Sequence, residues 1–226
     1  MHWISFFILI SIKYLSKLFY RFEVNYQPIP TKRDWNDIRI IIFLHHTSLF
    51  EFLYLSILPN YFLWKLSQRM VAPAANKTMD RPLVGLFFKL LNPGMIPITR
   101  KRDDSWANFI ASIKEDAIIL IAPEGRMKRK NGLDSFGEKM TVKSGVVDIL
   151  QELNTGKIAF AYSGGLHHIQ VPDTNRFKIF KTLKMNIELI DVMEYKNSFN
   201  NNISSTDWNV TVLNDLQHRL ETKIPK

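Results

Sequence analysis

The chain has 226 residues, which is enough for one domain with a large core, or at most one domain and a small appendage. Its 46% hydrophobic content excludes a disordered chain, and the lack of cysteine excludes disulfides, thiolate metal sites and cysteine nucleophiles. The net charge of +9 favours an anionic partner, which leaves nucleic acid, an anionic membrane surface and a phosphate-bearing substrate open.

The N-terminal segment has the composition of a membrane-associating helix. Trp3 to Ile12 is an apolar or small-residue run, but Lys13 and Lys17 interrupt it. A spanning helix needs about 20 apolar residues. The two lysines fall on one helical face, which favours a helix that lies in the membrane interface or enters it only shallowly.

Two alternatives for this segment remain open, a helix packed on the globular domain and a short membrane span. A signal peptide fits less well, because there is no basic start and no small-residue cleavage site. Pro28 and Pro30 are typical of a linker. We therefore expect residues 1–27 to form a hydrophobic membrane anchor and residues 28–226 to form the globular domain.

Strand and helix patterns alternate along the rest of the chain. Short apolar runs predict strands over residues 40–44, 70–74, 95–99, 117–122 and 157–162, and alternating residues predict further strand within 176–193. Start signals and amphipathic spacing predict helices over residues 48–58, 83–91, 104–115, 142–153 and 207–221. This order indicates an α/β fold with a mostly parallel central sheet flanked by helices.

The first of these strands ends at two histidines. Ser48 and Glu51 follow as a helix-start signal, so the stretch reads as strand, sharp turn and helix. The turn would bring His46 and Glu51 together at the carboxyl end of a parallel strand, where open α/β sheets keep their chemistry. An alternative is that Glu51 only caps the helix by bonding the Ser48 amide, and that His45 is a hydrogen-bonded histidine near the core.

A second apolar strand runs into Glu124, Gly125 and Arg126. Acyl transfer to a hydroxyl needs a base, for which histidine titrates in a suitable range, and a carboxylate that orients the imidazole. No Gly-x-Ser-x-Gly elbow is present, which favours direct attack by the acceptor hydroxyl. Arg100 and Arg126 follow strand ends, and the arginine fork matches the phosphate oxygens of an anionic acceptor.

These residues resemble the motifs of the glycerolipid acyltransferases, the family of 1-acylglycerol-3-phosphate acyltransferases. His46-Thr-Ser-Leu-Phe-Glu51 is similar to the His-x4-Asp box, with Glu in place of Asp. Gly94-Met-Ile-Pro-Ile-Thr-Arg100 is similar to the block in which an arginine ends a short strand. Ala122-Pro-Glu-Gly-Arg126 resembles the Pro-Glu-Gly-Thr-Arg block that binds the acceptor's phosphate, with the arginine directly after the glycine.

The resemblance implies a membrane-associated O-acyltransferase. It would move a fatty acyl group from acyl carrier protein or coenzyme A to the hydroxyl of a lysophospholipid such as 1-acylglycerol-3-phosphate. It implies no cofactor, no metal and no nucleic-acid partner, and a place at the cytoplasmic face of the cell membrane. His46 would be the base and Glu51 would orient it. The acceptor site would be shaped by Arg100, Glu124, Gly125 and Arg126.

Other functions remain as alternatives. One is an acyltransferase for another membrane lipid, and another is a non-catalytic lipid-binding protein on the same fold, which only the Glu51 substitution supports. A nucleic-acid-binding domain ranks lower, because no helix-turn-helix and no stacking aromatics among the basic residues are recognisable. His167 and His168 lack a third ligand at metal spacing, so we expect them to be structural or exposed.

Overall fold

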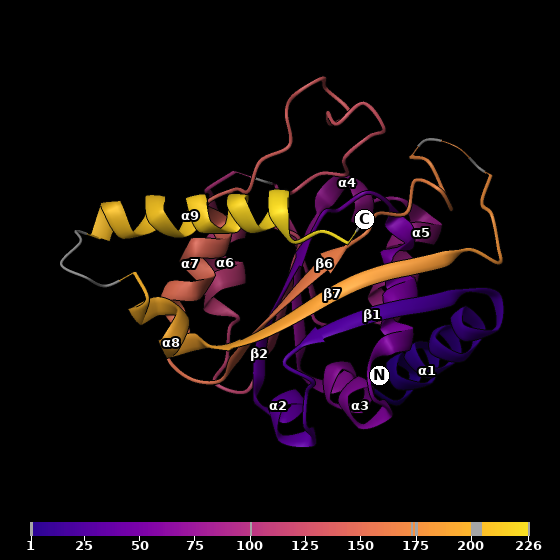
Figure 1. Ribbon diagram of the computed structural model, residues 1–226, viewed down its shortest axis with the longest axis horizontal. Coiled ribbons are helices and arrows are strands. Elements are labelled where there is room, and N and C mark those ends of the chain that lie inside the picture. Colours follow the sequence, from indigo (N-terminus) through magenta and orange to yellow (C-terminus); the bar gives the residue numbers. More distant parts are fainter. Residues whose placement is uncertain (1, 100, 173, 175, 200–204, 226) are drawn as a thin grey trace. The chain divides into compact units, whose positions relative to one another are not determined.

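The computed structural model, drawn in Figure 1, describes residues 2–99, 101–172, 174, 176–199 and 205–225. The chain divides into two compact units. Unit 1 comprises Met1–Leu18 and Leu53–Ile121, and unit 2 comprises Phe19–Phe52 and Ala122–Lys226. The expected boundary at residue 27 stays a prediction.

The strands of unit 2 pair in the order β1–β7–β6–β2. β1 (Arg21–Gln27) runs parallel to β7 (Thr182–Asp191), and β2 (Ile38–Leu44) runs parallel to β6 (Lys157–Ser163). β6 and β7 are antiparallel. Every second residue of β2, starting at its first isoleucine, is fully buried, which matches the apolar pattern of this strand.

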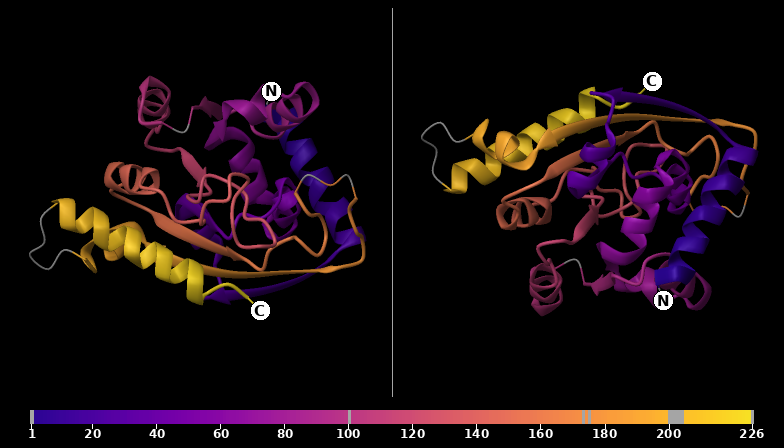
Figure 2. Two further views of the ribbon diagram at one scale, coloured as in Figure 1. Left: turned by 90° about the horizontal axis from the view of Figure 1, so that it is seen from above. Right: turned by 90° about the horizontal axis from the view of Figure 1, so that it is seen from below.

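The helices of unit 2 are α2 (Lys32–Asp37), α7 (Gly145–Glu152), α8 (Val192–Asn197) and α9 (Ser205–Thr222). Helix α9 packs beside β6 and β7 (Figure 2), where Arg219 joins the helix to the strands. Arg219 Nη1 donates to Glu188 Oε2 of β7 at 2.7 Å and to the Tyr162 hydroxyl of β6 at 3.1 Å, while its Nε donates to Asp215 at 2.6 Å. A largely buried ion pair therefore fastens the C-terminal helix to the strands.

In unit 1, β3 (Met70–Ala75) pairs in parallel with both β4 (Met95–Ile98) and β5 (Ile118–Ile121). Its helices are α1 (His2–Phe19, all but its last residue), α3 (Asn60–Arg69), α4 (Asn76–Met79), α5 (Pro82–Leu91) and α6 (Asp104–Ala111). The 3₁₀ helix η1 (Leu49–Ile57) begins in unit 2 and ends in unit 1.

These pairings confirm the predicted fold class. Among the described residues, each strand pair inside a unit is parallel except β6–β7, and helices flank the strands. Four details differ from the sequence-based expectation. The helix expected from residue 48 is a 3₁₀ helix, α6 ends at Ala111, β7 ends where Asp191 caps α8, and residues 21–27 form strand β1. The alternation of polar and apolar residues in β1 is the strand signal that pointed to this outcome.

Three of the four buried residues of helix α1 are polar (Ser5, Lys13 and Ser16), while many of its large apolar residues are exposed. Ser5 Oγ donates to the Leu91 carbonyl at 2.6 Å, and Lys13 Nζ donates to the Leu58 carbonyl at 2.7 Å. The exposed large side chains of this helix are Trp3, Ile4, Phe7, Tyr14, Leu15, Leu18 and Phe19. Burying polar groups against backbone carbonyls leaves the apolar face without a covering layer of protein.

Lys13 and Lys17, which the sequence places on one helical face, differ in their burial. Lys17 is exposed, but Lys13 is buried, because its ammonium group satisfies a carbonyl oxygen of Leu58 and the amide oxygen of Asn60 at 2.6 Å. By length and composition, α1 is the helix among the described residues that is long and apolar enough to cross a membrane. One face of it is nevertheless packed on unit 1.

We predict that Arg219→Met lowers the free energy of unfolding by about 3 kcal/mol, because Glu188 and Asp215 lose a partner in a poorly hydrated site. Urea denaturation followed by circular dichroism measures this change. Arg33→Ala is the matched control, since Arg33 pairs with Asp37 through a side chain that is 91% exposed, and its loss is expected to cost less than about 1 kcal/mol. Equal effects of the two substitutions would contradict the role of Arg219.

Candidate active site

The chain turns sharply at the carboxyl end of β2. His45, the next residue, has φ of +70°, a left-handed conformation that ends the strand. Its Nδ1 bonds the Ser163 carbonyl at 2.8 Å, and burial lowers the pKa of its imidazole. A Cβ atom on Gly165 would lie 3.0 Å from the His45 ring, so glycine gives the ring its space. His45 is therefore a neutral, structural histidine that shapes the turn, as one of the sequence-based alternatives proposed.

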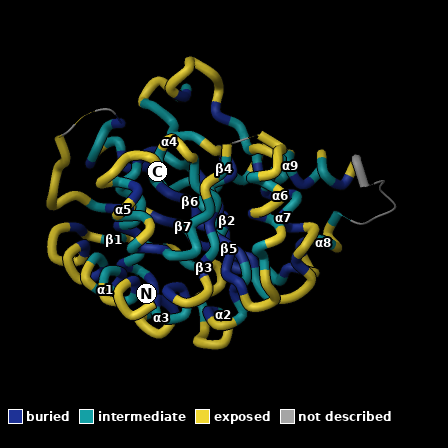
Figure 3. Tube along the Cα trace, turned by 180° about the vertical axis from the view of Figure 1, so that it is seen from behind, coloured by how far each residue is buried: buried dark blue, intermediate teal, exposed yellow. Residues whose placement is uncertain are grey.

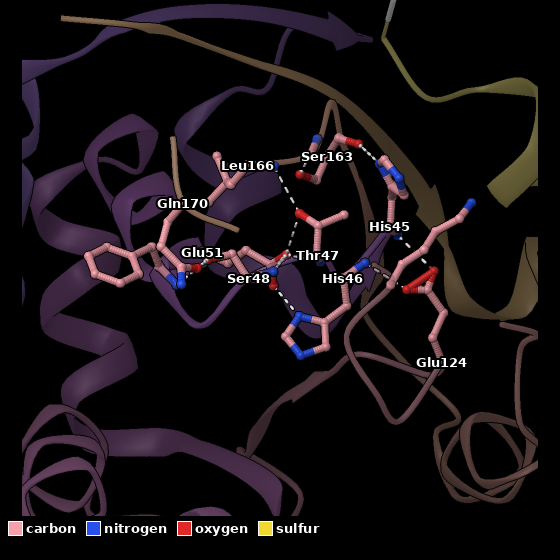
Figure 4. A network of polar contacts seen from close by, with 12 residues as sticks. His45, His46, Thr47, Ser48, Glu51, Glu124, Ser163, Leu166 and Gln170 are labelled. Atoms are coloured by element: carbon pink, nitrogen blue, oxygen red, sulfur yellow. Dashed lines mark hydrogen bonds and ion pairs between the residues drawn. The ribbon is translucent and has the colours of Figure 1, made fainter. Parts of the chain in front are cut away.

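His46 and Glu51 meet directly. His46 Nδ1 contacts Glu51 Oε2, and Figure 4 shows the imidazole turned towards this carboxylate. The contact places the proton on Nδ1 and makes Nε2 the basic nitrogen. The His46 side chain is 21% exposed and that of Glu51 12%, so the pair is shielded from bulk water while the imidazole remains accessible.

The second oxygen of Glu51 caps the start of η1. Glu51 Oε1 accepts the Thr47 N–H at 2.6 Å and the Ser48 N–H at 3.2 Å. Ser48 Oγ in turn accepts the Phe50 N–H at 3.1 Å, which completes the capping arrangement. The capping and catalytic interpretations of Glu51 are therefore compatible, because each uses a different oxygen of one carboxylate.

Glu124 holds the same turn from the other side. This residue is 1% exposed, and its two oxygens accept the backbone N–H groups of His45 at 3.1 Å and of His46 at 2.6 Å. Burial raises the pKa of Glu124 to about 7, and the hydrogen bond from His46 opposes that shift. The structure thus places Glu124 against the backbone of the turn after β2 (Figure 4), where it positions His46.

Gly125 and Arg126 follow in an exposed turn. Gly125 has φ of +70°, and no atom lies within 4 Å of the position that a Cβ would occupy, so a ligand has access to the backbone here. Arg126 Nη1 bonds Asp134, whose pKa it holds at about 2, and the guanidinium lies 4.5 Å from the centre of the Phe136 ring. These contacts fix the guanidinium in one position, with its side chain 38% exposed.

Arg100, the remaining sequence-predicted site residue, lies outside the described residues. The other predicted residues all belong to unit 2, and the structure joins His46, Glu51 and Glu124 in one hydrogen-bonded group. Their roles in binding and catalysis stay predictions.

The loop from Ser163 to Gln170 was not recognised in the sequence as a support of the turn. Thr47 Oγ1 accepts the Leu166 N–H at 2.8 Å, and Ser48 Oγ donates to Gln170 Oε1 at 2.7 Å. The carbonyl of His46 accepts the Lys128 N–H at 2.7 Å. The glycine pair 164–165 after a buried strand was the available signal, since it indicates a close approach of another segment.

His167 and His168 each bond a backbone carbonyl. His167 Nε2 lies 2.6 Å from the Lys128 oxygen, and His168 Nε2 lies 2.9 Å from the Thr182 oxygen. In the part of the chain that the structure describes, no group of three or more His, Asp or Glu side chains is placed to hold a metal ion. Both histidines thus have a structural contact.

Comparison with known families supplies the decisive observation. The model of the family described as Acyltransferase matches residues 22–163, more than half of the chain. The chain belongs to this acyltransferase family. The matched range contains the His46 turn and the Glu124 turn, and it ends at Ser163, whose carbonyl bonds His45. The protein is therefore an acyltransferase, and the candidate site lies within its family region.

The fold agrees with this assignment. A crystal structure of the 1-acyl-sn-glycerophosphate acyltransferase PlsC from Thermotoga maritima matches 96% of this chain and 82% of that chain, with a TM-score of 0.53 and 15% sequence identity. At this identity the likeness shows the fold alone. A search of curated protein sequences gave no match.

We predict that the stabilising effect of Glu124 falls as the pH rises from about 4.5 to about 7. The native state holds the Glu124 proton more tightly than the unfolded chain, so its contribution is complete below pH 4.5 and is lost as the pH passes the folded pKa of about 7. The free energy of unfolding of the wild type minus that of Glu124→Gln should therefore fall by about 3 kcal/mol over this range. Urea titrations at several pH values measure it, and a difference that is independent of pH would contradict the raised pKa.

Proposed function

We propose that this acyltransferase moves a fatty acyl group from a thioester of acyl carrier protein or coenzyme A to the hydroxyl of a lysophospholipid such as 1-acylglycerol-3-phosphate. The contact between His46 Nδ1 and Glu51 Oε2 carries the proposal, because it makes an oriented base at the end of a buried strand. Family membership supports the reaction type. The acceptor is suggested by the motif resemblance and by the 1-acyl-sn-glycerophosphate acyltransferase whose structure is similar to this chain.

The proposed reaction is a direct transfer. His46 Nε2 takes the proton of the acceptor hydroxyl as the hydroxyl oxygen attacks the thioester carbonyl carbon. Glu51 stabilises the imidazolium that forms, and it keeps the ring in the correct orientation. When the carbon–sulfur bond breaks, the leaving thiolate takes the proton from the imidazolium. Atoms and charge balance without a cofactor, a metal or an acyl-enzyme.

Arg126 is the proposed anion-binding group for the acceptor. It follows Gly125, whose backbone is open to a ligand, and Asp134 and Phe136 hold its guanidinium in place. A fixed guanidinium loses less conformational freedom when it binds a phosphate oxygen. We propose Arg100 as a second such group on the strength of its motif. Glu124 serves this site indirectly by positioning the His46 backbone.

Membrane association at the cytoplasmic face of the cell membrane is also proposed, with a role in phospholipid synthesis. The exposed apolar face of α1 supports it, since large apolar side chains such as Trp3 and Phe7 are 62% and 61% exposed. A helix of this kind fits the interface plane, where its apolar face enters the acyl region. The alternative acceptor is another membrane lipid with a free hydroxyl.

We predict that His46→Ala lowers the turnover number at least about 10³-fold, because the acceptor hydroxyl loses its base. Thiol release by the purified enzyme, measured with both donor types and a panel of lyso-acceptors, tests the base and identifies the acceptor. His218→Ala is the matched control, since His218 is an exposed residue of α9. Full activity of a folded His46→Ala enzyme would remove the mechanism.

We predict that Glu51→Gln separates the two roles of this side chain. The amide oxygen can still accept the Thr47 and Ser48 N–H groups, so the free energy of unfolding should change by less than about 1 kcal/mol. The turnover number should fall about 10²- to 10⁴-fold, because the imidazolium loses its counter-charge. Kinetics and urea denaturation of the same sample measure both quantities, and a loss of activity that merely follows a loss of folding would speak against the catalytic role.

A further inference from the structure

An exposed segment of alternating character directly precedes β7. All residues from Arg176 to Lys181, here called the 176–181 segment, are exposed (Figure 3). Its apolar members are Phe177, Ile179 and Phe180, which are 59%, 39% and 70% exposed, and its basic members are Arg176, Lys178 and Lys181. Single exposed apolar residues are ordinary on protein surfaces, but three within four positions, alternating with cations, are not.

The segment is held in a defined conformation. The Lys178 N–H donates to the Ile169 carbonyl at 2.9 Å, and Phe177 forms an antiparallel bridge with Gln170. The Phe180 N–H donates to the Phe19 carbonyl at 2.7 Å, and the centres of these two rings lie 6.2 Å apart. Ordered backbone contacts thus display the aromatic rings at the surface.

The backbone of Phe180 is strained although its ring is exposed, which suggests that the exposed rings have a function. Its φ of +58° is in the left-handed region, which a bulky residue with a Cβ adopts only with backbone strain. A ring that is 70% exposed gains little from burial in return. Such an arrangement is favourable only when the rings have another apolar medium to enter.

The same segment contacts the catalytic turn. The Phe177 ring stacks on the Phe50 ring with centres 6.1 Å apart, and Phe50 directly precedes Glu51 in η1. Gln170, the bridge partner of Phe177, accepts the hydroxyl hydrogen of Ser48 at 2.7 Å. All of these residues belong to unit 2. The position of the segment is therefore linked to the turn that carries His46 by contacts on two sides.

We propose that the 176–181 segment docks on an anionic lipid bilayer, with Phe177 and Phe180 in the boundary between headgroups and acyl chains. Arg176, Lys178 and Lys181 then lie at the level of the lipid phosphates, where each cation is attracted by the surface potential. This second contact is independent of α1 and of the identity of the acceptor. It holds the His46 turn at the membrane surface, where a lysophospholipid resides.

The mixture of basic and apolar side chains in the segment favours a lipid bilayer as its partner. A bilayer surface presents acyl chains and phosphates within one thin layer, so neighbouring aromatic and basic side chains are satisfied together. Acidic residues, which the surface potential would repel, are missing from the segment. An acidic protein such as a carrier protein is the competing occupant, and the experiment separates the two.

The lack of cysteine in the chain allows a site-specific test. Phe177→Cys and Phe180→Cys are each labelled with an environment-sensitive fluorophore and mixed with vesicles of phosphatidylcholine with or without phosphatidylglycerol. Emission at both sites should shift to the blue and rise several-fold on the anionic vesicles, and lipids brominated near the headgroup should quench it. Val210→Cys on α9, where the native side chain is 52% exposed, is the control site and should show no change.

A charge variant tests the electrostatic part. Lys178→Glu should weaken the response of the label at position 177 to anionic vesicles by about fivefold or more. Lys77→Glu, which reverses an exposed charge on α4, should leave that response unchanged. Equal effects of the two reversals would overturn the electrostatic contribution of the segment.

Two results would overturn the proposal as a whole. One is that the emission of the labels at positions 177 and 180 does not change although the protein sediments with the vesicles. The other is a label that responds to acyl carrier protein in the absence of vesicles, which would assign the segment to the donor protein. His46→Ala should leave the label response unchanged. A failure of the catalytic mechanism is therefore distinguishable from a failure of docking.

Discussion

The conformation of the turn from His45 to Ser48 depends on two carboxylates that accept hydrogen bonds from consecutive residues of the turn. Glu124 accepts the backbone N–H groups of His45 and His46, while Glu51 accepts those of Thr47 and Ser48 and also contacts the His46 ring. Four consecutive backbone N–H groups thus donate hydrogen bonds to two carboxylates that are buried or half-buried. A turn constrained in this way fixes the position of the imidazole, which is the property that the proposed general-base role of His46 requires.

The supports of this turn come from distant parts of the chain. The Glu124 contacts span 78 and 79 positions, and the bond between His45 and the Ser163 carbonyl spans 118. Contacts of such sequence separation form only when the strands of unit 2 are assembled, so the geometry of the site is a product of the fold and not of the local motif. The substitution of Glu for Asp is accommodated in the same way, since one oxygen caps a 3₁₀ helix while the other reaches the histidine.

Large apolar side chains are exposed at two surfaces, one on α1 and one on the 176–181 segment. In α1, Ser5 and Lys13 bond carbonyl oxygens inside unit 1, and the aromatic residues are exposed. In the 176–181 segment of unit 2, backbone bonds hold Phe177 and Phe180 at the surface beside basic side chains. Contact with an apolar medium would remove both surfaces from water, which agrees with the lipid acceptor and the membrane contacts proposed above.

The sequence by itself determined the fold class, the strands at β2, β5 and β6, and the two turns that hold His46, Glu51 and Glu124, because buried strands and caps are encoded by local patterns. It did not report that Lys13 is buried, and it missed β1 as well as the loop from Ser163 to Gln170 that supports the turn. Only the tertiary structure decided that Glu51 both caps and orients, and that Glu124 faces backbone amides. Which atoms a carboxylate meets depends on segments that are remote in sequence, and no linear spacing reports them.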